Sequence, residues 1–124
     1  MAARSRGSRQ AAERDGRRAE WLAALWLRVR GYRVLARNVR TPLGEIDMIV
    51  RRGNIVTFVE VKRRQTEDDA RRAVTVKQRQ RIARAARYLA DSGRFGPDVE
   101  AYRFDVVAVR RRALPLHIVD AWRP

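Results

Sequence analysis

The chain has no cysteine and only one histidine among its 124 residues. The absence of cysteine excludes disulfide bonds, thiolate catalysis and cysteine-based zinc sites. A single histidine likewise excludes metal sites that are built from several imidazoles. That residue, His117, stands between Leu116 and Ile118, so we interpret it as a satisfied sheet residue and not as a ligand or a base.

Long apolar runs are also absent. No stretch approaches the roughly 20 apolar residues that are needed to cross a bilayer, and the basic start lacks the apolar segment of a secretory signal. The arginine- and serine-rich start also resembles an organellar transit peptide, but Glu13 and Asp15 come early and a helical pattern follows. We therefore expect a cytoplasmic protein that does not bind membranes.

Acidic residues are scarce relative to basic ones. Lysine and arginine number 29 against 14 aspartates and glutamates, which gives a formal net charge of +15. A coding bias explains the choice of arginine over lysine but not the size of the excess. Nucleic acid is the favoured partner, because arginine grips phosphate oxygens bidentately and each neutralised phosphate releases counterions. An acidic membrane surface is the alternative.

The length suits one domain, with a disordered basic arm at residues 1–12 and a folded domain at residues 13–124. A helix is predicted at about 13–30, because apolar residues recur there at three- and four-residue steps. They are Ala19, Leu22, Ala23, Trp26 and Val29. A second helix is predicted at about 75–90, with Ile82, Ala85, Ala86 and Leu89 facing inward.

Apolar and β-branched runs predict five strands. They lie at residues 32–39, 45–51, 55–62, 102–109 and 116–121, and a polar loop is expected at 64–73. The order is helix, three strands, helix, two strands. We therefore predict the α/β class, with a mixed sheet and flanking helices.

The clearest local feature is a hairpin around Gly53-Asn54. A glycine in the first position of a two-residue connection favours a type II′ turn. Pairing Arg52 with Ile55 then places Asp47 opposite Glu60, at a Cβ separation of roughly 4.5–5.5 Å. Two like charges at that distance call for a compensating cation.

The same register places Glu45 opposite Lys62. With a period of two, these two residues share one face with Asp47 and Glu60, and the other face carries Ile46, Met48, Val59 and Val61. The charged face also continues the apolar stripe of Val56 and Phe58, where unpaired charge is costly. Mg²⁺ is commonly held by one or two carboxylates; the alternative is an ordinary solvent-facing patch that is balanced by arginines.

Two runs of this hairpin resemble the YraN family of uncharacterised bacterial proteins, predicted members of the restriction-endonuclease-like PD-(D/E)xK superfamily. They are Gly44-Glu45-Ile46-Asp47 and Phe58-Val59-Glu60-Val61-Lys62-Arg63. Further similar blocks are Gly16-Arg17-Arg18-Ala19-Glu20, Gly31-Tyr32, Lys77-Gln78-Arg79, Tyr88-Leu89 and Arg103-Phe104-Asp105-Val106-Val107. The likeness covers about residues 16 to 121, and it implies a core of helix, three strands, helix and strand.

The resemblance also implies roles for the charged residues. Asp47 and Glu60 would bind Mg²⁺ or Mn²⁺, Lys62 would assist the attacking water, and Glu20 on the first helix would join the metal ligands. Ile46 stands where the wider superfamily has proline, which leaves the metal ligands intact.

Substrate contacts are expected at the start of the second helix, where Lys77 and Gln78 could meet a phosphate. Arg63 and Arg79 are further candidates, and the alternative for all of them is a solvated surface. Trp26 is expected in the core, and Trp122 is open to either a core or a base-stacking role. Asp105 could simply pair with an arginine.

The leading hypothesis is a metal-dependent endonuclease that acts on DNA, including branched or damaged DNA. A two-fold symmetric homodimer would suit an enzyme that cuts both strands. One alternative is a non-catalytic nucleic-acid-binding module that retains the fold. Another is a basic RNA- or ribosome-associated protein, for which the charge alone would suffice.

Overall fold

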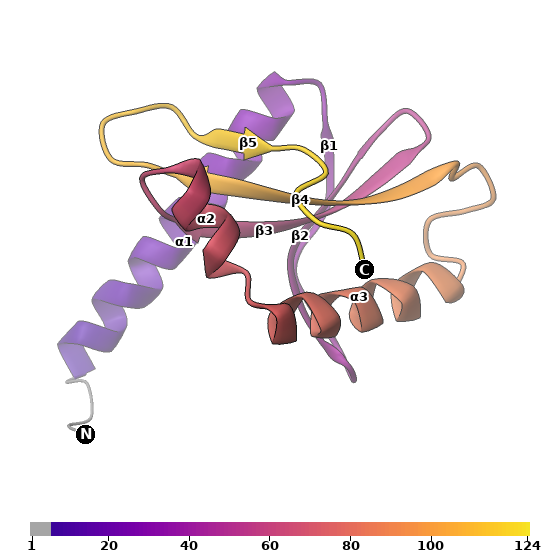
Figure 1. Cartoon of the computed structure of the whole chain (residues 1–124), viewed down its shortest axis with the longest axis horizontal. Helices are drawn as coiled ribbons and strands as arrows, with labels where there is room; N and C mark the ends of the chain where they lie inside the picture. The colour runs from indigo at the N-terminus through magenta and orange to yellow at the C-terminus, as the bar shows by residue number, and fades with distance from the viewer. Residues whose placement is uncertain (1–5) are drawn as a thin grey trace.

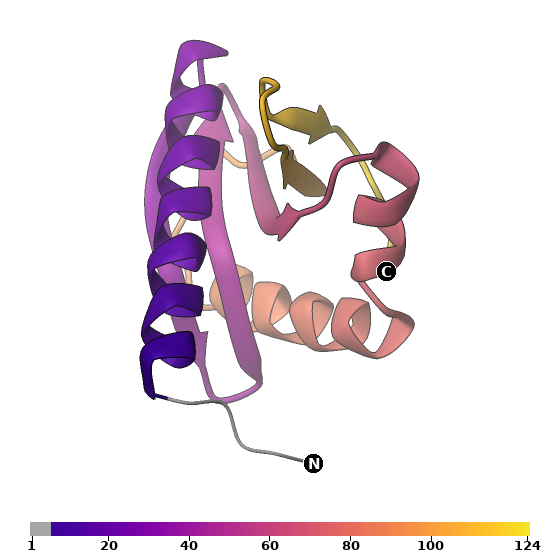
Figure 2. The same cartoon turned by 90° about the vertical axis from the view of Figure 1, so that its left-hand side faces the viewer.

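The computed structural model describes the backbone of residues 6–124 and the side chains of residues 14–124. A five-stranded sheet with the spatial order β1-β2-β3-β4-β5 lies between two helical layers (Figures 1 and 2). The elements in chain order are α1 (Arg6–Val29), β1 (Arg33–Thr41), β2 (Gly44–Arg52), β3 (Ile55–Arg63), α2 (Glu67–Ala73), α3 (Val76–Asp91), β4 (Ala101–Val109) and β5 (Leu116–Ile118). The predicted mixed α/β class and element order are confirmed, and the arrangement fits a restriction-endonuclease-like fold.

The sheet is mixed because of one connection. β3 and β4 run parallel, whereas the other neighbouring pairs are antiparallel. A parallel pair needs a crossover, and α2 and α3 supply it. The carboxyl ends of β3 and β4 therefore lie side by side, with Arg63 paired to Val109.

The predicted hairpin between β2 and β3 is confirmed in turn and register. Arg52 pairs with Ile55, and the ladder continues to Met48 and Val59. Gly53 has a φ of 60°, while Asn54 is not among the residues with positive φ. This combination belongs to a type II′ turn, since a type I′ turn needs positive φ at both positions.

Helix α1 begins earlier than the sequence predicted. Residues 6–12 were assigned to a disordered arm, but the helix includes them, and only residues 1–5 of that arm lie outside the described part of the chain. The predicted boundary followed apolar periodicity, whereas good helix formers such as Gln10 and Ala11 extend a helix without an apolar face.

The buried face of α1 is also rotated from the predicted one. Val29 was expected inward but is 72% exposed, whereas Leu27 is fully buried. Packing against the sheet decides which side of α1 is buried, and there Leu27 joins Met48 and Val107 in one apolar cluster. Trp26 is half-buried and outside both core clusters.

The polar segment 64–73, predicted as a loop, contains helix α2. Thr66 caps it by accepting a hydrogen bond from the amide of Asp69 at 3.2 Å. Acidic residues fill its first turn and Arg71 and Arg72 its last, which suits the helix dipole. The sequence did not predict this helix, because seven residues contain too few apolar positions for a helical repeat to be recognised.

Each face of the sheet has its own apolar cluster. Helices α2 and α3 cover the larger cluster, which includes Phe58 and Phe104, and α1 covers the smaller one. Trp122 is 7% exposed and its ring stacks on Phe104 with centroids 4.2 Å apart. This residue is therefore part of the core.

Across residues 6–124, none of the helices combines the length and the apolar character that a bilayer span requires.

The aromatic core predicts the cost of one truncation. Phe58 is 2% exposed and its ring contacts Phe95 and Phe104. We expect Phe58→Ala to lower the free energy of unfolding by about 3–5 kcal/mol, since a cavity replaces the ring. In urea unfolding the control Leu114→Ala, at a position 65% exposed, should change it by less than about 0.5 kcal/mol; equal losses would contradict the assignment of this core.

Candidate functional site

The candidate site lies where β2 and β3 part. Their backbone ladder ends at Met48 and Val59, one pair short of the predicted pairing of Asp47 with Glu60. In place of a backbone pair, the Asp47 carboxylate accepts a hydrogen bond from the amide of Val61 at 2.9 Å. Beyond this point β2 is paired with β1, and β3 with β4.

The parting of the strands corrects two predictions. Ile46 and Met48 do not share a face, because Ile46 packs in the cluster under α3 and Met48 in the cluster under α1. Glu45 does not belong to the charged patch either: its side chain is 69% exposed and forms an ion pair with Arg40 on β1 at 3.3 Å. Strict alternation assumed that the ladder continues to Glu45 and Lys62, but it stops three pairs earlier, at Met48 and Val59.

Glu60 is a carboxyl group buried in the apolar layer under α3. The residue is 4% exposed, and its Oε1 atom has no hydrogen-bond partner among the described residues. Burial is the main cause that raises the pKa of Glu60 to about 9, and the charge of the neighbouring Asp47 carboxylate and hydrogen bonding to it contribute to the same rise. The structure therefore places these two carboxyl groups beside one another, so that the ionisation of one opposes that of the other.

Lys62 lies two residues further along the same face of β3. Its Nζ donates a hydrogen bond to Oε1 of Gln78 on α3 at 3.2 Å. Gln78 is itself fixed at the start of the helix, where its amide donates to the capping hydroxyl of Thr75 at 3.1 Å. The charge of Lys62 opposes the rise in the pKa of Glu60 without cancelling it.

The other residues that were predicted to contact the substrate do not gather at one place in the structure. Lys77 is exposed. Arg79 donates to the carbonyl of Val74 at 3.1 Å, so it holds the turn between α2 and α3. Arg63 forms an ion pair with Asp15 on α1 at 3.3 Å, on the face of the sheet opposite to Gln78.

Glu20 approaches the site from α1 but contacts another residue first. Its carboxylate accepts a hydrogen bond from the side-chain amide of Asn38 at 2.8 Å. Asn38 falls opposite Asp47 in the register of β1 and β2 and has a φ of 52°. Sequence reasoning missed Asn38, and its only signal was the tolerance of asparagine for left-handed backbone.

The acidic side chains near the site number two and not three. Among the side chains from residue 14 on, no group of three acidic or histidine residues could jointly hold a metal ion. Asp47 and Glu60 alone match the one or two carboxylates with which proteins commonly hold Mg²⁺. The metal role of Glu20 stays a prediction.

A second buried polar network lies on the opposite face of the sheet. Arg103 donates two hydrogen bonds of 2.8 Å to Asp105 and one of 2.8 Å to the hydroxyl of Tyr32. His117 lies 2.7 Å from the same carboxylate. Burial alone would raise the pKa of Asp105, but the bonds to His117 and Arg103 hold it below its usual value. The network thus ties β5 to β4 with its carboxylate fully partnered.

Comparison with known proteins agrees with the resemblance seen in the sequence. Residues 19–109 match the family described as "Uncharacterised protein family UPF0102", to which the YraN family corresponds. A UPF0102 protein of Caulobacter vibrioides is 48% identical over 123 residues, which are 98% of each chain. UPF0102 proteins of Erythrobacter litoralis and Parvibaculum lavamentivorans are 45% and 49% identical, over 94% and 92% of this chain and 98% and 85% of their own lengths.

The buried Glu60 carboxyl predicts a pH-dependent effect on stability in the presence of a chelator. The pKa of Glu60 is 4.5 in the unfolded chain and about 9 in the folded protein. The stability that the protonated group contributes is therefore complete below about 4.5 and lost as the pH rises towards 9. Glu60→Gln has no proton to lose and should raise the free energy of unfolding by roughly 1–3 kcal/mol at pH 8, and by less at pH 5.

Urea unfolding of the wild type, Glu60→Gln and the exposed control Glu45→Gln at pH 5, 6.5 and 8 checks this expectation. A gain for Glu60→Gln that does not change with pH would contradict it, as would an equal gain for Glu45→Gln.

Proposed function

The chain belongs to the uncharacterised protein family UPF0102, and we propose that it is a metal-dependent nuclease that hydrolyses phosphodiester bonds in DNA. The observation that carries this proposal is the unpartnered Oε1 atom of Glu60, buried beside the Asp47 carboxylate. Two carboxyl groups that compete for one proton in an apolar layer are destabilising unless a cation joins them.

The donor set fits a hard divalent cation. Asp47 and Glu60 would hold Mg²⁺ or Mn²⁺, because both offer carboxylate oxygens, the sequence has no cysteine and its one histidine is bonded to Asp105. When bound, such an ion polarises a phosphate and lowers the pKa of a coordinated water. Asp47 keeps one oxygen on the amide of Val61, which fixes the direction of its carboxylate before any ion arrives.

Lys62 is placed to act on the substrate and the attacking water. Its ammonium group lies on the same face of β3 as Glu60, and the hydrogen bond to Gln78 holds it there. A fixed positive charge next to the scissile phosphate stabilises the negative charge that develops on its oxygens. Gln78 is thus a positioning residue that acts through Lys62.

Incubation of DNA substrates with matched variants tests the proposal. Linear duplex, single-stranded and four-way-junction DNA are each mixed with wild type, Glu60→Gln or Glu45→Gln, with Mg²⁺, Mn²⁺ or chelator. We expect wild type and Glu45→Gln to cleave only with metal, and Glu60→Gln to be slower by at least about 100-fold. Binding by all three proteins without cleavage by any would overturn the proposal and favour a non-catalytic binding module.

The lysine and its glutamine partner should differ in the size of their effects. We expect Lys62→Met to lower the cleavage rate at saturating DNA by about 100-fold or more, because it removes a charge from the transition state. Gln78→Ala should lower it by about 3- to 10-fold, because the ammonium group remains but is held less firmly. The exposed neighbour provides the control Lys77→Met, and an equal loss for Lys77→Met and Lys62→Met would refute the role of Lys62.

A further inference from the structure

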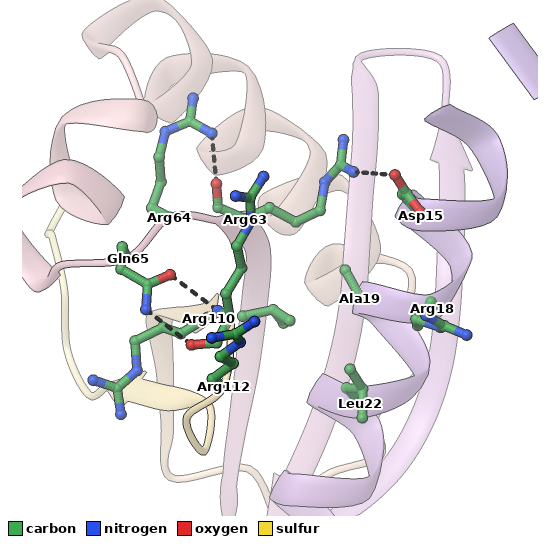
Figure 3. Close-up of a pocket in the computed structure, with 11 residues that line it drawn as sticks. Asp15, Arg18, Ala19, Leu22, Arg63, Arg64, Gln65, Arg110 and Arg112 are labelled. Atoms are coloured by element: carbon green, nitrogen blue, oxygen red, sulfur yellow. Dashed lines mark hydrogen bonds and ion pairs between the residues drawn. The ribbon is translucent and has the colours of Figure 1, made fainter. Parts of the chain in front are cut away.

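An arginine-lined pocket opens next to the candidate site, between α1 and the carboxyl ends of β3 and β4 (Figure 3). Its volume is about 1160 Å³. We call it the arginine pocket; it is lined by Asp15, Arg18, Ala19, Leu22, Arg63, Arg64, Gln65, Val109, Arg110, Arg111 and Arg112. It contains neither metal ligand of the proposed nuclease site.

The charge of the pocket is almost entirely positive. Six arginines surround it against one acid, Asp15, which is paired with Arg63. The guanidinium groups of Arg18, Arg111 and Arg112 make no hydrogen bond or ion pair with any residue that the structure describes. Like charges without counter-charges on the lining of one pocket repel one another, and an anion that binds there relieves the repulsion.

One glutamine joins the two arginine runs that form the wall. Arg63 ends β3 and Arg64 follows it, and Arg110, Arg111 and Arg112 follow β4. The Gln65 side chain accepts a hydrogen bond from the amide of Arg111 at 2.9 Å and donates one to its carbonyl at 3.0 Å. Figure 3 draws both bonds as dashed lines that start at the labelled Gln65. Gln65 thus bonds to both backbone groups of Arg111 and fixes the distance between the segment that follows β3 and the segment that follows β4.

The pocket and the candidate site adjoin through successive residues. Lys62 faces Gln78 on the α3 side of β3, and Arg63 faces Asp15 on the α1 side. On α1, Ala19 lines the pocket and Glu20 bonds to Asn38, opposite Asp47. The two sites therefore lie on opposite faces of the sheet and adjoin at the carboxyl end of β3.

We propose that the arginine pocket holds the phosphates of a nucleic-acid strand beside the position where it is cut, with Gln65 as the residue that preorganises this subsite. The inference depends on the proposed function for the identity of the polyanion. The concave shape favours a strand over a bilayer, since a strand can enter a hollow whereas lipid headgroups form a broad surface. The apolar lining of Ala19, Leu22 and Val109 gives the sugars and bases a surface to pack against.

Salt dependence of binding tests the subsite apart from catalysis. A labelled 30-nucleotide single-stranded DNA is titrated with protein in chelator between 50 and 200 mM salt. Three chains are compared: wild type, the pocket variant Arg64→Gln/Arg111→Gln/Arg112→Gln, and the control Arg33→Gln/Arg84→Gln/Arg94→Gln. Both variants lose the same charge, and the control positions are exposed and outside the pocket.

We expect the pocket variant to bind at least about 10-fold more weakly than the control, and its salt slope to fall by about 2 to 3. Gln65→Ala, which keeps the net charge, should weaken binding about 2- to 5-fold without a large change in slope, because the arginines lose their fixed positions. Thermal unfolding confirms that each variant is folded.

Equal weakening in the pocket variant and the control would overturn the subsite, since only the overall field would then matter. The subsite would also fail if the pocket variant kept its DNA binding and lost only its binding to phosphatidylserine vesicles. If the pocket variant alone loses DNA binding while wild type cleaves nothing with Mg²⁺, the subsite stands and the nuclease proposal fails. If wild type cleaves and the two triple variants bind alike, the nuclease proposal stands and the subsite fails.

Discussion

The arrangement of this site depends on one buried carboxyl group. Glu60 lies in the same apolar layer as Phe58, with its Oε1 atom unpartnered among the described residues and Asp47 beside it. Each of these conditions makes ionisation costly, and Lys62 relieves only part of the cost. The end of the β2–β3 ladder brings Asp47 close to Glu60, because there the Asp47 carboxylate accepts a hydrogen bond from the Val61 amide in place of a backbone pair.

Asp105, the other buried acid among the side chains of residues 14–124, shows the contrast. Asp105 is just as deeply buried, at 1% exposure, but Arg103, His117 and the amide of Asp120 all bond to it. The protein can therefore bury a carboxylate with full compensation when the role is structural. That Glu60 lacks such partners is a property of its place in the fold, and it agrees with a position that a bound cation completes.

The sheet also divides the charged groups between its two faces. At the end of β3, Lys62 and Gln78 lie on the α3 side, while Arg63 and the arginine pocket lie on the α1 side. Because β3 and β4 are parallel, the arginine runs that follow them lie side by side, and Gln65 bonds across the gap. The two charged groups therefore meet at the carboxyl end of β3, on opposite sides of the sheet.

The sequence by itself determined the hairpin, because Gly53 allows the positive φ that a type II′ turn needs and the alternation beside it fixes the register as far as Met48 and Val59. It likewise determined the mixed α/β class and, apart from the short helix α2, the element order, which follow from local periodicity. The tertiary structure alone decided where the β2–β3 ladder ends, and hence that Glu45 turns to Arg40 and Lys62 to Gln78. It also decided the phase of α1, the partners of His117 and the meeting of Gln65 with Arg111, because those contacts join segments far apart in the chain and leave no local pattern.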